Sequence, residues 1–405
     1  MRSNIAVTLV LVVLAFLRGS TAAAQQTRAE QAWRQRADKA AKLHPYERTR
    51  VESALYVIES KQLGARIFNP PRGLFARVGG LVEQAGLAAG PAFRLSRPAL
   101  SFTVSSAVST KAYWVADATL VAPQLADGRL FTVITATHKE LPQQDFYGLG
   151  SASLRTGRTN FALSDSVVSG LIGTRLTPWL TISGLAEYLA PRVAQGTDRR
   201  MPSIEAVFTE AAAPGLGQQP DFRRLEGRAI IDYTAPADRP DSGGRYSVAY
   251  QRFADLDFHR FSFDRLDLDL QQYVPIIDGF RTIALRALAS VSDPAPGQDV
   301  PFYLQRTLGG AYSLRGLDPY RMRDRNLLLL QAEYRWTINA FASGALFFDT
   351  GKVGHQIDDL NLRNLERDYG IGVRLGSAHG VALRADIAFG SHEGTRVMLR
   401  FNDVF

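Results

Sequence analysis

Apolar and polar residues alternate with a period of two along most of the chain that follows Gly73. The clearest runs lie at positions 283–291, 328–336, 371–375 and 383–389. In each run, aliphatic or aromatic residues share one face, and charged residues, glutamine, serine or glycine share the other. Successive side chains of a β-strand point to opposite sides, so this pattern predicts strands with one apolar and one polar face.

The alternation changes phase within positions 260–271. The apolar residues occupy odd positions at Phe261 and Phe263, and even positions from Leu266 onward. A β-bulge inserts one extra residue into a strand and so moves the following residues to the other face. We therefore predict a bulge near residues 264–265.

Turn residues separate the alternating runs roughly every twenty positions, which predicts about sixteen strands over residues 73–405. An exported chain with such strands is typical of an all-β fold, a closed antiparallel transmembrane β-barrel. Inside a membrane every backbone polar group must be paired, and a closed barrel pairs them all. A soluble β-sandwich or propeller is the alternative. It is disfavoured because no strand is a long buried run and because the chain ends on an alternating strand.

The last strand carries a further signal. Val397, Leu399, Phe401 and Phe405 share one face, and Phe405 is a terminal aromatic residue. This arrangement resembles the C-terminal assembly signal of outer-membrane barrels. We therefore expect the barrel assembly machinery to act on this chain during its own insertion.

The first 24 residues are typical of a cleavable secretory signal peptide. Arg2 supplies positive charge, residues 5–17 are apolar, and the small residues 22–24 fit a cleavage site. An anchored N-terminal helix is the alternative, but an apolar run of this length is too short to span a bilayer. Residues 25–72 predict a short periplasmic segment with helical stretches. Together these features predict export to the outer membrane of a Gram-negative bacterium.

Composition restricts the chemistry. The chain contains no cysteine, which excludes a lipoprotein anchor and a disulfide framework. Its six histidines have no metal-ligand spacing, and it has no phosphate-binding loop and no Gly-x-Ser-x-Gly motif. We therefore expect no catalytic residue, no metal and no cofactor. The net charge of +8 suits lipopolysaccharide phosphates or a solvated lumen, and no motif indicates nucleic-acid binding.

Two isolated carboxylates stand on strands that are otherwise apolar on one face: Glu333 within LLLLQAEYRW and Asp349 within ALFFDTGKVG. A buried carboxylate needs a cationic partner to keep its charge. Arg315, in the polar loop of residues 295–325, is the candidate. Adjacent barrel strands lie about 4.8 Å apart, so one guanidinium can bridge both carboxylates. The alternative is that all three are ordinary lumen charges.

Residues 307–353 resemble the outer-membrane assembly and secretion barrels of the BamA-type superfamily, also called bacterial surface antigen barrels. The resemblance is carried by three stretches in order: Leu314-Arg315-Gly316-Leu317, the Gln-Ala-Glu that ends at Glu333, and the Phe-Phe-Asp-x-Gly around Asp349. It extends to the glycine-rich start of the barrel at residues 71–91 and to residues 368–376.

The resemblance implies that the loop folds into the barrel lumen and that Arg315 pairs with Glu333 and Asp349 as a latch. Gly316 would let the loop backbone approach the wall. Leu317 stands where the family usually has an aromatic residue, which leaves the seating of the loop open. Classical members also carry periplasmic POTRA domains, for which residues 25–72 leave no room.

Two functions follow from these observations. The first is assistance in protein insertion or translocation at the outer membrane, in contact with lipid and lipopolysaccharide. Its partners would be a protein substrate or a separate periplasmic receptor. The second is a passive channel or structural surface protein whose loop plugs the lumen. Neither function needs bond chemistry, so we expect that the protein is not an enzyme.

Overall fold

The computed structural model of the protein describes residues 70–236, 240–277, 280–339, 341–377, 380–390 and 392–400. The predicted signal peptide and most of the predicted helical segment, together with Phe401 and Phe405, lie outside these residues. In the described part of the chain, no helix combines the length and the apolar character needed to cross a membrane.

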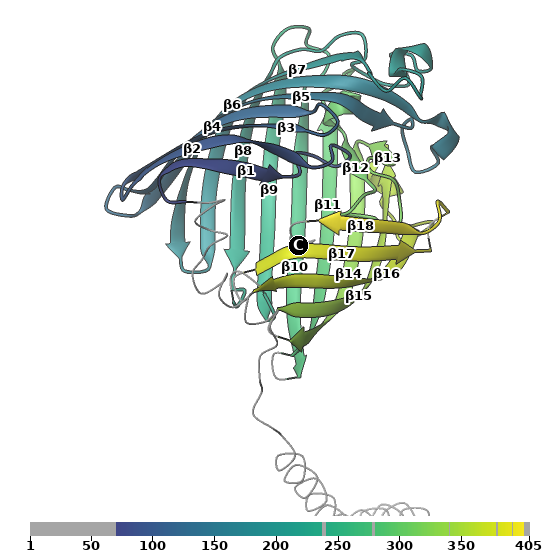
Figure 1. The fold of residues 1–405 in the computed structure, drawn as a ribbon. Helices are drawn as coiled ribbons and strands as arrows, with labels where there is room; N and C mark the ends of the chain where they lie inside the picture. Colours follow the sequence, from purple (N-terminus) through teal and green to yellow (C-terminus); the bar gives the residue numbers. More distant parts are fainter. Residues whose placement is uncertain are drawn as a thin grey trace, which may run out of the picture. The chain divides into compact units, whose positions relative to one another are not determined.

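A single antiparallel sheet of sixteen strands dominates the fold (Figure 1). Its neighbours follow chain order, and a separate two-stranded ribbon lies between the eleventh and twelfth of its strands. The strands of the sheet are β1 (Gly73–Gly79), β2 (Ala88–Arg97), β3 (Leu100–Ser109), β4 (Trp114–Leu125), β5 (Leu130–Phe146), β6 (Thr159–Thr177), β7 (Leu180–Gln195), β8 (Phe222–Asp232), β9 (Gly243–Asp255), β10 (Phe263–Ile277), β11 (Arg281–Pro294), β14 (Asn326–Asn339), β15 (Ala342–Gly354), β16 (Glu366–Ser377), β17 (Gly380–Phe389) and β18 (Arg396–Arg400). The strand number predicted from the sequence is therefore confirmed.

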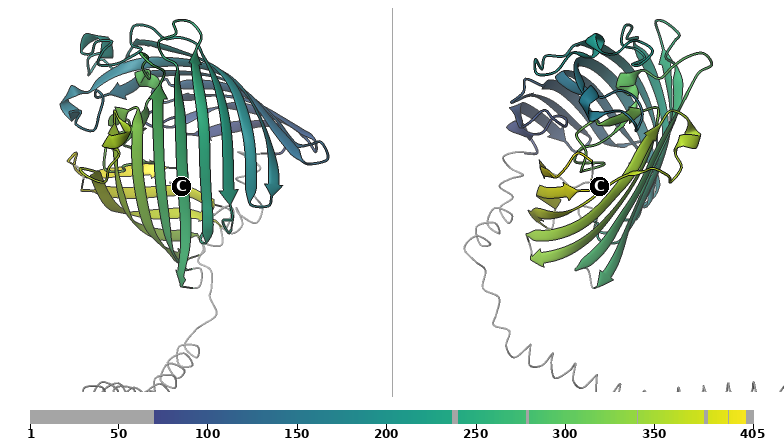
Figure 2. Two further views of the ribbon diagram at one scale, coloured as in Figure 1. Left: turned by 180° about the vertical axis from the view of Figure 1, so that it is seen from behind. Right: turned by 90° about the vertical axis from the view of Figure 1, so that its right-hand side faces the viewer.

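The sheet curls so that one face is enclosed and the other faces outward (Figure 2). On β14 the residues at 327, 329, 331 and 333 are buried, and those at 328, 330, 332 and 334 are partly exposed. On β16 and β15, Ile371, Val373, Leu346 and Phe348 are more than two-fifths exposed. The apolar faces predicted for these strands point outward, and the polar faces point inward.

Long and short connections lie at opposite ends of the strands. At one end, loops of residues 147–158, 196–221 and 295–325 link successive strands. At the other end the turns are short, as at residues 98–99 and 178–179. This asymmetry is typical of outer-membrane barrels, whose extracellular loops are long and whose periplasmic turns are tight.

The bulge predicted near residues 264–265 is wrong. β10 pairs with both of its neighbours without a register shift between Phe263 and Tyr273. Phe261 precedes the strand, so it does not set the phase of the alternation. Phe263 is buried because its ring stacks on Phe253, with the ring centroids 4.4 Å apart. An aromatic residue on the enclosed face had been read as lying on the outward face.

The sheet has two edges. Its strand order runs from β1 to β18, and in the described residues no register joins these two strands. We call the border between β1 and β18 the seam (Figure 1). The described sheet is therefore open at the seam, unlike the closed barrel predicted from the sequence.

Candidate functional site

The loop of residues 295–325 joins β11 to β14 and turns back on itself. Two short strands within it, β12 (Arg306–Leu308) and β13 (Met322–Asp324), pair with each other. Between them lies the loop tip, residues 309–321. The Ser313 hydroxyl ties the start of the tip, because it accepts a hydrogen bond from Gly309 N (2.9 Å) and donates one to Gly309 O (3.1 Å). Gly309 has a φ of +112°, a conformation that favours glycine.

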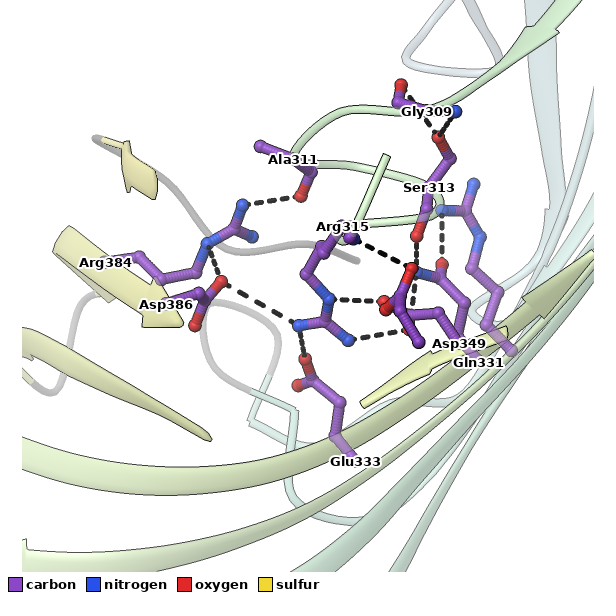
Figure 3. Close-up of polar contacts among 12 residues, drawn as sticks. Gly309, Ala311, Ser313, Arg315, Gln331, Glu333, Asp349, Arg384 and Asp386 are labelled. Carbon is purple, nitrogen blue, oxygen red and sulfur yellow. Dashed lines mark hydrogen bonds and ion pairs between the residues drawn. The ribbon is translucent and has the colours of Figure 1, made fainter. Parts of the chain in front are cut away.

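The tip directs Arg315 onto the enclosed face of the sheet, where it meets both predicted carboxylates (Figure 3). Arg315 Nε lies 2.6 Å from Asp349 Oδ2, and Nη2 lies 2.7 Å from Asp349 Oδ1. Arg315 Nη1 lies 2.6 Å from Glu333 Oε1. All three side chains are fully buried. The fork of the guanidinium thus binds one carboxylate with two nitrogens and the other with the third.

Two further contacts fix the guanidinium. Its central carbon lies 3.5 Å from the centroid of the Phe347 ring, which is a cation–π contact. Burial opposes the charge of Arg315, but Asp349 and Glu333 outweigh burial and raise the pKa of the guanidinium above its usual value. Arg315 therefore stays charged although it has no contact with solvent.

The strand registers explain why Glu333 and Asp349 can share one arginine. Gln331 on β14 pairs with Asp349 on β15, so Glu333 is two residues along from the partner of Asp349 and on the same face. Gln331 also donates to Asp349 Oδ1 (3.1 Å) and to Ser313 O in the loop (3.0 Å). The strand that presents the carboxylates therefore also binds the loop backbone.

The site is larger than the sequence predicted. Arg374 on β16 lies 2.9 Å from Glu333 and 3.2 Å from Asp386 on β17. Arg335 lies 2.7 Å from Glu333, and Arg384 lies 3.0 Å from Asp386. The sequence did mark these residues as the polar faces of their strands. It could not show that four strands and the loop bring them to one place.

The backbone of the motif is bound as well. Gly316 N donates to Asp368 Oδ2 on β16 at 2.8 Å. With Asp368 included, the cluster holds four arginines and four carboxylates, so its formal charges balance. We call this set the latch cluster: Arg315, Arg335, Arg374, Arg384, Glu333, Asp349, Asp368 and Asp386. Such balance is what makes many charges tolerable in a buried place.

Leu314 and Leu317 flank the arginine and seat the tip in apolar surroundings. Leu314 is fully buried and Leu317 is 5% exposed. Both belong to a cluster with residues of the ribbon and of β14 and β15, namely Leu308, Met322, Leu327, Leu329 and Val353. The tip is therefore held by an apolar contact as well as by the latch cluster.

Replacing Leu317 by phenylalanine, the residue type usual in the resembling family, is expected to destabilise this protein by about 1–3 kcal/mol, because the larger ring overpacks a filled site. Urea unfolding in lipid vesicles, followed by tryptophan fluorescence, measures the change. The matched control is Leu362→Phe, since Leu362 is 70% exposed in a loop. Equal midpoints for Leu317→Phe and the unchanged protein would show that the site has room for an aromatic ring.

The predicted C-terminal assembly signal is described only in part. Val397 and Leu399 are 76% and 58% exposed on β18, on the side away from the buried Met398. Phe401 and Phe405 lie outside the described residues. Among the residues that are described, no group of three or more histidine, aspartate or glutamate side chains could hold a metal ion.

Comparisons with known proteins bear on the family. Residues 228–402 match the Omp85 superfamily domain, which confirms the resemblance drawn from the Arg-Gly loop and the strands after it. The similar start at residues 71–91 lies outside the matched range. No curated protein matches the chain.

Two solved structures are similar in fold. One is BamA from Haemophilus ducreyi lacking POTRA domains 1–3, with a TM-score of 0.58 and 12% identity, covering 86% of this chain and 77% of that chain. The other is CdiB from Escherichia coli, with a TM-score of 0.55 and 11% identity, covering 81% of this chain and 61% of that chain. At these identities the likeness concerns the fold.

Proposed function

The chain carries an Omp85 superfamily domain over residues 228–402, and from this premise we propose that it is an outer-membrane β-barrel that assists the insertion or translocation of other proteins. The observation that carries the proposal is the latch cluster. It buries Arg315 of the Arg-Gly loop against Glu333 and Asp349, at full burial and with hydrogen-bond distances. A loop held in this way inside a barrel shapes the lumen.

In this proposal the sheet closes at the seam when it lies in the membrane, because unpaired backbone groups are not tolerated in hydrocarbon. The outward apolar side chains contact lipid, and lipopolysaccharide surrounds the long loops. The barrel assembly machinery inserts the chain itself. A protein substrate, delivered directly or by a separate periplasmic receptor, is the client.

The client enters at the seam, because β1 and β18 are the strands whose backbone groups a new strand can pair with. The step forms and breaks hydrogen bonds only, and folding of the client drives it. The protein needs no cofactor and acts on no covalent bond.

A disulfide across the seam tests this function. Cysteines placed singly in β1 and β18 have no background, since the chain contains no cysteine. When oxidised, we expect the variant to stop promoting the insertion of a second outer-membrane barrel into phospholipid vesicles, and to regain this activity on reduction.

The matched control links β10 to β11 through Leu268→Cys and Ala289→Cys, which are register partners away from the seam. This disulfide leaves the seam free to open, so it should leave activity unchanged. An oxidised seam variant that is as active as its reduced form would contradict entry at the seam.

A passive channel is the second candidate, favoured by a polar cavity of about 670 Å³ on the enclosed face. Arg228, Arg286, Arg306, Asp267 and Asp269 are among the residues that line it. Conductance in planar bilayers, with and without residues 295–325, separates the two functions. A steady, solute-selective pore in the intact protein favours the channel, and a mostly closed barrel favours assistance in insertion.

A further inference from the structure

The two borders of the seam approach the same segment of chain. β1 and β18 share no register in the described residues, yet elements next to each of them contact the loop tip of residues 309–321. The tip therefore connects the beginning of the sheet to its end (Figure 2). This role is separate from the anchoring of Arg315 on the wall.

On the C-terminal side, three contacts join the tip to β17, β18 and the turn between them. Arg384 Nη2 on β17 donates to Ala311 O at 2.7 Å. Glu393 in the turn accepts a hydrogen bond from Asp318 N at 2.9 Å. Arg396 on β18 forms an ion pair with Asp318.

On the N-terminal side, the turn between β1 and β2 and the loop between β5 and β6 contact the same tip. Glu83 Oε1 in the first turn accepts a hydrogen bond from Ala311 N at 2.7 Å. Arg155 Nε lies 3.0 Å from Asp318 Oδ2, and Arg321 Nη1 donates to Ser153 Oγ at 2.9 Å. Ala311 is thus bound through its N–H from one side of the seam and through its C=O from the other.

Glu83 is the closest link to β1. Its side chain is fitted to the tip, because a Cβ on Gly310 would overlap the Glu83 carboxylate, and Gly310 has a φ of +96°. Arg400 at the end of β18 lies 3.9 Å from Glu83 Oε1. A cavity of about 490 Å³ lies here, lined by residues of the first turn and by Tyr312, Leu399 and Arg400. The carboxylate therefore stands between the loop tip and both edge regions.

We propose that Glu83 is a positioning residue that clasps the seam: it holds the first hairpin to the last strands through Ala311 of the loop tip. The clasp sets the separation of β1 and β18, and its release widens the seam while Arg315 stays in the latch cluster. This inference rests on the proposed role of the seam in admitting a client, and it names what controls the seam.

Distance measurement between spin labels tests the clasp on the full-length protein in phospholipid vesicles, without any client. One label pair spans the seam, at Leu74→Cys and Val397→Cys, which are 80% and 76% exposed. The control pair lies on the continuous wall, at Val248→Cys and Val373→Cys, both on outward faces. Glu83→Ala removes the acceptor, and Gly310→Ala displaces the carboxylate from the loop side.

We expect both substitutions to shift the seam distances to longer values and to broaden their distribution, with the control pair unchanged. Glu83→Gln keeps an oxygen acceptor for Ala311 N, so it should restore a narrower distribution than Glu83→Ala. A seam distribution that is unchanged in either Glu83→Ala or Gly310→Ala overturns the clasp. Equal shifts in the seam and control pairs also overturn it, because they would report a general loss of structure.

The measurement is independent of client insertion. A protein without insertion activity can still show the clasp, and an active protein can lack it. The failure of this inference is therefore distinguishable from the failure of the proposed function.

Discussion

Replacing Arg315 by alanine is expected to lower the free energy of unfolding by about 3–5 kcal/mol, because it leaves buried carboxylates without their cation. Asp349 loses two hydrogen bonds and Glu333 loses one, and all the side chains concerned are closed to solvent. Urea unfolding in lipid vesicles and the heat-modifiable shift on gel electrophoresis measure the loss.

Two controls give the Arg315 result its meaning. Arg315→Lys keeps the charge but not the planar fork that binds Asp349 with two nitrogens, so it should recover part of the stability. Arg155→Ala removes an arginine whose side chain is 54% exposed and should cost about 1 kcal/mol or less. If Arg315→Ala unfolds at the same urea concentration as the unchanged protein, the latch cluster does not stabilise the barrel.

Replacing Glu333 by alanine is the second large effect, with an expected loss of about 3–5 kcal/mol. Glu333 accepts contacts from three arginines: Arg315 at 2.6 Å, Arg335 at 2.7 Å and Arg374 at 2.9 Å. Its removal leaves an excess of buried positive charge among strands β14 to β17. The same unfolding assay measures the loss.

A double-mutant cycle tests whether Glu333 and Arg315 act together. The variant with both replaced by alanine should lose less stability than the sum of the two single losses, because each first loss already breaks their shared contact. Glu140→Ala is the matched control, since the Glu140 side chain is 40% exposed. Strict additivity of the two losses would show that Arg315 and Glu333 are not energetically coupled.

The local pattern of the chain predicted much of the wall. A period of two follows from strand geometry alone, so the outward face of β14, β16 and β17 could be assigned before any contact was known. The prediction failed at Phe263, because an aromatic side chain suits both a lipid-facing surface and an enclosed aromatic cluster. Only the stacking of Phe263 on Phe253 decides which face it occupies.

The latch cluster shows the same division. Arg315, Glu333 and Asp349 were singled out because lone charges on apolar strands demand partners and because their spacing resembles a family. Asp386, Arg374 and Arg384 were not joined to them, although they stand on the predicted polar faces. Their proximity depends on the registers of four strands and on the seating of the loop, which no local spacing encodes.

The sequence by itself determined the strand number, the facing of most strands and the identity of the central arginine and its two carboxylates. These properties depend on side-chain periodicity and on the free energy of burying a charge, and both are local. The tertiary structure alone decided the balance of the latch cluster, the open seam and the meeting of Glu83, Ala311 and Arg384. These contacts join residues 73 to 301 positions apart in the chain, and chain folding, not sequence spacing, sets the distances between them.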